Sequence, residues 1–96
     1  MAKHFFRQLP NLALSEEVMQ TIIGDVLCHK AKSNLLKAIM WLDTFGTDKE
    51  FLGNSLVKTS EGWELVAKGE SEWRFPISVT YEESTPNFEL ISYYKK

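Results

Sequence analysis

The chain has 96 residues, the size of one domain, and its 44% hydrophobic and 12% aromatic content exclude an intrinsically disordered protein. A formal net charge of −2, from 11 basic and 13 acidic residues, excludes a protein that holds nucleic acid mainly through its phosphates. Cys28 is the only cysteine, so no internal disulfide can form. No apolar stretch approaches the roughly 18–20 residues of a membrane span, and residues 1–14 lack the features of a signal peptide. We therefore expect one cytoplasmic domain over residues 1–96.

Residues 1–10 leave two interpretations open. The sequence His4-Phe5-Phe6 is compatible with a short edge strand over residues 3–7, or with a tether that two aromatic side chains pin to the core. Pro10-Asn11 then interrupts the segment, because both residue types favour turns.

A first helix is predicted over residues 16–29. Ser15 is a suitable N-cap, and Glu16 and Glu17 stand beside the positive end of the helix dipole. Gly24 lies inside the apolar pattern and weakens it by about 1 kcal/mol relative to alanine. The apolar residues with helical spacing are Val18, Met19, Ile22, Ile23, Val26 and Leu27.

A second helix is predicted over residues 34–45, with Ser33 or Asn34 available as its cap and Gly46 at its C-terminal end. Its apolar residues are Leu35, Leu36, Ile39, Met40, Leu42 and Phe45. One helix over residues 16–45 is the alternative, since the two apolar stripes have nearly the same phase. At 1.5 Å per residue that helix would be about 45 Å long, too long for so small a globule to cover, so two helices are preferred.

The rest of the chain predicts an antiparallel meander of three or four strands over residues 55–94. Residues 56–59 and 63–67 read as strands around a turn, after a loop over residues 46–53. A turn is predicted at residues 82–87, where the pattern is broken. Helices followed by strands place the chain in the α+β class, with two N-terminal helices packed on the sheet.

The strand that begins at Trp73 shows the clearest alternation in the chain. One face would carry five large apolar side chains, and we expect the helices to cover all of it. These residues are Trp73, Phe75, Ile77, Val79 and Tyr81.

The sequence predicts neither a metal site nor a catalytic site. His4, Cys28 and His29 are the only soft metal ligands, and three donors with two adjacent do not meet the four-ligand requirement of structural zinc. No nucleophile, base and orienting group can be assembled from the sequence pattern. We therefore expect no metal, no cofactor and no catalytic residue.

Several residues near the C-terminus are predicted to form a partner-binding surface. Pro76 should lie at a sheet edge or at a bulge, because proline cannot donate to the hydrogen-bond ladder, and an edge strand there would be a place for a partner to dock. Ile91 and Tyr93 should point away from the core, since they alternate with Phe88 and Leu90. The predicted surface consists of Pro76, Ile91, Tyr93, Tyr94, Lys95 and Lys96.

These observations favour a small cytosolic, non-catalytic protein that acts by binding a macromolecular partner. An inhibitor, an antitoxin or immunity partner, or a phage-encoded modulator of a host enzyme would fit. The partner is expected to be another protein, and neither a nucleic acid nor a membrane; its identity and the oligomeric state stay open.

Residues 35–96 also resemble the phage-derived HigB branch of the RelE-like toxins. The resemblance rests on Leu42-Asp43-Thr44-Phe45-Gly46, Gly62-Trp63-Glu64-Leu65, Trp73-Arg74 and Lys95-Lys96. It implies two helices on an antiparallel sheet and cleavage of messenger RNA on the ribosome. Arg74 would then stabilise developing charge, while Tyr93, Tyr94, Lys95 and Lys96 would contact RNA. The chain departs from the family at Val66, where an arginine usually stands, and in its negative net charge. An mRNA-cleaving toxin of a toxin–antitoxin pair is therefore the alternative function.

Overall fold

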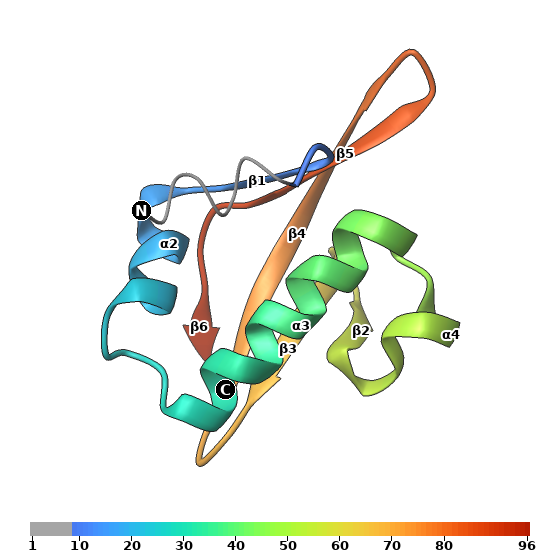
Figure 1. The fold of residues 1–96 in the computed structure, drawn as a ribbon. Coiled ribbons are helices and arrows are strands. Elements are labelled where there is room, and N and C mark those ends of the chain that lie inside the picture. The colour runs from blue at the N-terminus through green and yellow to red at the C-terminus, as the bar shows by residue number, and fades with distance from the viewer. Residues whose placement is uncertain (1–8) are drawn as a thin grey trace.

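The computed structural model describes residues 9–96, in which three α-helices and a six-stranded mixed sheet make an α+β domain (Figure 1). The predicted strand over residues 3–7 lies outside the described residues. The helices are α2 (Glu16–Ile23), α3 (His29–Phe45) and α4 (Lys49–Leu52), and a 3-10 turn, η1 (Gly53–Ser55), follows the last of them. The strands are β1 (Leu12–Leu14), β2 (Leu56–Thr59), β3 (Gly62–Lys68), β4 (Glu72–Glu82), β5 (Thr85–Leu90) and β6 (Tyr94–Lys95).

The helix α2 begins as predicted and ends earlier than predicted. The Ser15 hydroxyl accepts a hydrogen bond of 3.1 Å from the Val18 N–H, which satisfies one of the free donors of the first turn. The helix ends at Ile23 and not at residue 29. Gly24 closes it by donating to the Gln20 carbonyl, and a Cβ at this position would lie 2.7 Å from that oxygen. The close approach requires glycine here, and the single helix over residues 16–45 is wrong.

The helix α3 begins at His29, five residues before the predicted start at 34. Ser33 and Asn34 therefore lie within the helix and do not cap it. The Asn34 amide instead donates a hydrogen bond of 2.7 Å to the Lys68 carbonyl, which joins the helix to the end of β3. The predicted end at Gly46 is confirmed, with φ of 68° at that residue. The buried residues of α3 are Ala31, Leu35, Ala38, Ile39 and Leu42.

The strands β2 to β5 form the predicted antiparallel meander, and two further strands extend it. The sheet has the order β1-β5-β4-β3-β2, with β1 parallel to β5 and β6 antiparallel to the first part of β4. The expectation of a purely antiparallel sheet of three or four strands is therefore wrong. Strands of two and three residues, such as β6 and β1, are too short to show alternation in the sequence. The short helix α4 lies within the predicted loop over residues 46–53.

The hairpin between β4 and β5 turns more tightly than predicted. Only Glu83 and Ser84 form the turn, both with positive φ (53° and 75°), as in the two-residue turns that match strand twist. The strand β5 therefore includes Pro86, and the predicted turn over residues 82–87 is too long. The hairpin projects well beyond the helices (Figure 1).

The core lies between α3 and one face of β3, β4 and β5, which we call the inner face; the opposite face is the outer face. Phe75 is fully buried, and Trp73 and Ile77 pack against the core as predicted. The last two apolar residues of β4 are not covered: Val79 is 37% exposed and Tyr81 is 73% exposed. The expectation that helices cover this whole face is wrong, because β4 continues past the end of α3 (Figure 1).

We expect two substitutions on this one face of β4 to differ strongly in their effect on stability. Phe75→Ala should lower the free energy of unfolding by about 3–5 kcal/mol, through lost burial and a cavity. Tyr81→Ala should change it by less than about 0.5 kcal/mol, since the ring is mostly in solvent. Urea unfolding of both variants measures this difference. A large loss in Tyr81→Ala would show that the projecting hairpin is covered.

Candidate functional site

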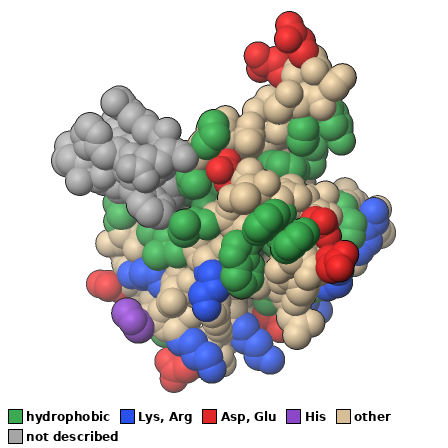
Figure 2. Space-filling model, turned by 45° about the vertical axis from the view of Figure 1, so that its right-hand side comes forward, with side chains coloured by type: hydrophobic (Ala, Val, Ile, Leu, Met, Phe, Trp, Pro, Cys, Tyr) green, Lys and Arg blue, Asp and Glu red, His purple; other side chains and the backbone are tan. Residues whose placement is uncertain are grey.

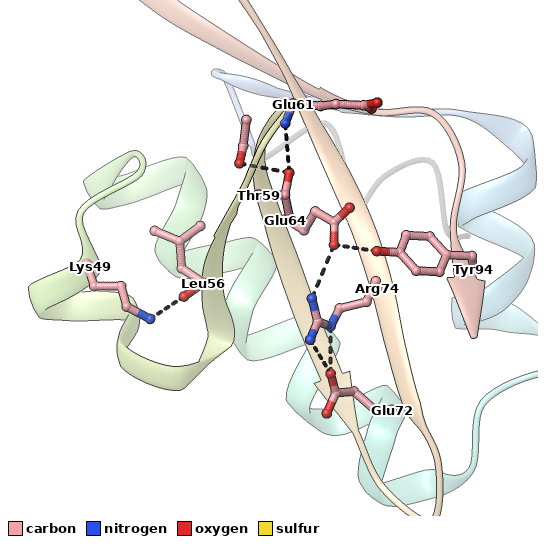
Figure 3. A network of polar contacts seen from close by, with 9 residues as sticks. Lys49, Leu56, Thr59, Glu61, Glu64, Glu72, Arg74 and Tyr94 are labelled. Carbon is pink, nitrogen blue, oxygen red and sulfur yellow. Dashed lines mark hydrogen bonds and ion pairs between the residues drawn. The ribbon is translucent and has the colours of Figure 1, made fainter. Parts of the chain in front are cut away.

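A network of charged side chains occupies the outer face of the sheet (Figure 3). Leu65 and Phe75 are buried on the inner face, so their neighbours Glu64 and Arg74 point to the outer face. The guanidinium of Arg74 lies 3.3 Å from Glu64 Oε1 and 2.5 Å from Glu72 Oε2. The Tyr94 hydroxyl donates a hydrogen bond of 2.7 Å to the same Glu64 oxygen. Three strands thus contribute to one network.

The ion-paired side chains of the network are largely shielded from water, whereas Tyr94 at its margin is 44% exposed, and the network carries two carboxylates for one guanidinium. The side chains of Arg74 and Glu64 are 11% and 10% exposed, and that of Glu72 is 27% exposed. Burial opposes the charge on Arg74, but the two carboxylates outweigh it and raise its pKa. The hydrogen bond from Arg74 lowers the pKa of Glu72, and the hydrogen bond to Glu64 raises the pKa of Tyr94. Arg74 is therefore a neutralised cation within the network.

These groups are of the kinds that perform acid–base chemistry. A carboxylate can move a proton, and a guanidinium can stabilise developing negative charge. Beside them an open cavity of about 420 Å³ is lined in part by Lys68, Glu72 and Arg74. Of these residues, the sequence pointed to Arg74 through the resemblance alone. Glu72 had the appearance of a solvated loop carboxylate, and Glu64 was not recognised as a site residue. The signal for Glu64 is a lone carboxylate inside the apolar strand Trp63-Glu64-Leu65-Val66.

Pro76 is not at a sheet edge, the first of its two predicted places, because β4 pairs on both sides. On one side its residues pair with β3. On the other side, residues 77–82 pair with β5 and residues 73–74 pair with β6, so residues 75–76 have no partner there. Pro76 stands at this interruption, where a residue without an N–H is tolerated.

Tyr93 lies on the inner face, contrary to the prediction. Its ring centroid lies 5.8 Å from that of Trp73 and 5.7 Å from that of Phe75. The cause is a change of register: Leu90 pairs with Ile77 and Tyr94 with Arg74, so residues 91–93 stand opposite residues 75–76 only. The one extra residue acts as a bulge and reverses which face each side chain occupies.

The other predicted partner-binding residues do not form one surface either. Ile91 is exposed, and its carbonyl accepts a hydrogen bond of 2.6 Å from Ser15. Tyr94 belongs to the outer-face network, whereas the Lys95 ammonium lies 5.9 Å from the Trp73 ring. The Lys96 N–H donates to the Glu72 carbonyl at 2.8 Å. The register change thus divides the predicted surface between the two faces of the sheet.

A second candidate site is an open groove of about 700 Å³ at the base of the projecting hairpin, which we call the apolar groove. One wall is the corner between α3 and α4, where the rings of Phe45 and Phe51 stack with centroids 4.2 Å apart. The floor and the other wall are the inner face of the hairpin and of β3. The apolar lining residues are Phe45, Trp63, Val79, Tyr81, Pro86 and Phe88.

Several acidic residues lie near the apolar groove, but Asp48 is the one that lines it. Glu82 lines a separate pocket with Thr80 and Asn87 on the outer face. Figure 2 shows acidic side chains at the end of the hairpin, above hydrophobic side chains; Glu82 and Glu83 stand there. Asp48 lines the opposite wall, and the exposed Glu50 follows it in α4. Lys49 directs its ammonium to the carbonyls of Gly53, at 2.9 Å, and Leu56.

The basic side chain of Lys58 lies beside the floor of the groove, with its ammonium 4.8 Å from the ring centroid of Trp63. The charged residues that line the groove are Asp48 and Lys49, one of each sign. The groove therefore combines an apolar lining with charges of both signs.

Within residues 9–96, no group of three or more His, Cys, Asp or Glu side chains could hold a metal ion. In the same part of the chain, no helix has the length and apolar character needed to cross a membrane. Comparisons with protein-family models, curated proteins and solved structures find no match for this chain. The outer-face network and the apolar groove are therefore the features from which a function can be proposed.

We expect the outer-face network to make stability depend on pH through Tyr94. The phenol has a higher pKa in the folded chain than in the unfolded one, because Glu64 accepts its proton in a hydrogen bond. Its contribution to stability is therefore complete below the unfolded pKa of about 10 and is lost as pH rises through the folded pKa. The free energy of unfolding in urea, measured as pH rises through the pKa of Tyr94, should show a decrease in wild type that Tyr94→Phe lacks. Tyr81→Phe, on the hairpin, is the control and should show the same decrease as wild type.

Proposed function

We propose that this chain is a small cytosolic, non-catalytic protein that binds a protein partner through the apolar groove. An inhibitor, an antitoxin or immunity partner, or a phage-encoded modulator of a host enzyme would act in this way. The observation that carries the proposal is the set of large apolar side chains exposed around one concave surface: Phe45 is 42% exposed, Val79 37% and Tyr81 73%. Exposed aromatic clusters of this kind mark interaction sites.

The charge of the chain supports a protein partner over a nucleic acid. Its formal net charge is −2, whereas binding of a phosphate backbone depends on neutralisation by lysine and arginine. A protein partner meets no such penalty, and aromatic side chains are the usual anchors of protein interfaces.

Affinity capture with a matched pair of variants tests this proposal. Wild-type protein should recover a stoichiometric partner from the native cell, and Tyr81→Ala should lose it while melting like wild type. Ile23→Ala removes another exposed apolar side chain, 56% exposed and located in α2, and should still recover the partner. Equal capture by wild type and Tyr81→Ala would exclude the groove as the contact surface.

An mRNA-cleaving toxin is the second candidate, and the outer-face network favours it. Glu64, Arg74 and Tyr94 are joined by hydrogen bonds and offer a carboxylate, a cation and a phenol. A toxin resembling the HigB branch would use Arg74 to stabilise charge on the cleaved phosphate. Two carboxylates already pair with that guanidinium, so a phosphate must compete with both; the network therefore supports this candidate less than the groove supports partner binding.

Inducible expression distinguishes the two candidates. A toxin should arrest growth, and Arg74→Ala and Glu64→Gln should each relieve the arrest, with Ile23→Ala as the variant that still arrests. Soluble, folded protein in every strain, checked by thermal melting of the purified variants, makes the comparison valid. Normal growth with folded wild-type protein would eliminate the toxin.

A further inference from the structure

The open cavity beside the outer-face network lies at an incomplete edge of the sheet, and we call it the edge cavity. The strand β2 begins at Leu56, which pairs with Leu65 of β3. Within residues 9–96, the last part of β3, residues 66–68, therefore extends past β2 without a paired strand on that side. The turn η1 and the helix α3 stand around this gap and contribute to the lining of the cavity, whose volume is about 420 Å³.

Part of the lining of the edge cavity is apolar. Val57 and Val66 each follow a buried leucine of the inner face, so they point to the outer face. The two valines lie diagonally across the paired strands, since Val57 pairs with Glu64, and both are partly exposed in the cavity. A ligand that covers them gains from removing apolar surface from water.

The polar part of the lining is rich in hydrogen-bond donors. Of the six polar residues there, five can donate: Asn34, Asn54, Ser55, Lys68 and Arg74. The sixth is Glu72, and one oxygen of its carboxylate is already ion-paired with Arg74 (Figure 3). A cavity with this excess of donors fits a ligand rich in acceptors, such as an oxyanion.

The charges at this end of the sheet also favour an anion. Lys68 lines the cavity, and within the described residues its ammonium has no ion-pair partner. On α3, the exposed Lys30 and Lys37 lie four residues before and three residues after Asn34, which places them on the same side of the helix as that residue. The acidic residue of the turn between β3 and β4 is Glu70, and the outer-face network adds one excess negative charge. Three lysines exceed these two negative charges.

We propose that the edge cavity binds a small phosphorylated molecule, with its phosphate at Lys68 and its apolar part on Val57 and Val66. A phosphate is favoured over a carboxylate because it presents three acceptor oxygens to the lysine and to the neutral donors beside it. Arg74 keeps both carboxylates, so no existing ion pair is broken. The volume of the cavity lies in the range of small-molecule sites. This site goes beyond the proposed function and does not depend on the apolar groove.

Phenyl phosphate is the probe, because it joins one planar ring to one phosphate. Titration of ¹⁵N-labelled protein, followed by NMR, should shift the amides of residues 54–57 and 66–68 in a saturable way. Inorganic phosphate lacks the ring and phenol lacks the anion, so each should bind at least about tenfold more weakly. Benzoate binding as tightly as phenyl phosphate would overturn the assignment of a phosphate. Inorganic phosphate binding as tightly would overturn the role of the two valines.

Two lysine variants separate a built site from general attraction of anions. Lys68→Gln should weaken phenyl phosphate by about tenfold or more. Lys58→Gln removes the same charge from an exposed side chain beside Trp63 and should bind the probe like wild type. Thermal melting of both variants checks that they are folded. Equal loss in the two variants, or no saturable shift around the cavity at millimolar probe, would overturn the proposal.

A third variant keeps this proposal separate from partner binding through the apolar groove. Tyr81→Ala, on the projecting hairpin, should bind phenyl phosphate like wild type while it loses the protein partner. Loss of phenyl phosphate binding in Tyr81→Ala would contradict the placement of the ligand in the edge cavity. Failure of partner capture with intact phenyl phosphate binding would overturn the proposed function alone.

Discussion

The packing of α3 against the inner face of β3 and β4 determines both candidate sites. Burial of Leu65 and Phe75 beneath this helix fixes the register of the two strands. Because side chains alternate along a strand, the same packing directs Glu64 and Arg74 to the outer face, where they meet. The helix then ends at Gly46 while the sheet continues, so the apolar face beyond that point forms a groove. One helix–sheet contact therefore positions a polar site on one face and an apolar site on the other.

The two sites differ in what they can offer a ligand. In the outer-face network, each polar group already has a partner, and a ligand must break the pairing of Arg74 with Glu64 and Glu72 before it gains a contact. In the apolar groove, rings such as that of Tyr81 are in contact with water, and any apolar ligand gains from covering them. A ligand can therefore bind in the groove without first breaking an existing contact. This asymmetry favours a binding protein over a catalyst.

The sequence predicted the elements that are determined by side chains close together in the chain. It did not predict features that depend on which strands pair and in what register. The cap at Ser15, the end at Gly46 and the meander from β2 to β5 follow from side chains close in sequence. The face of Tyr93 could not be predicted, because the extra residue in 91–93 is defined only against its partner strand. Arg74 was selected only through the resemblance to the RelE-like toxins, and its ion pair with Glu64 could not be predicted because it depends on the register between β3 and β4. The groove was missed because alternation indicates an apolar face and not how far a helix covers it.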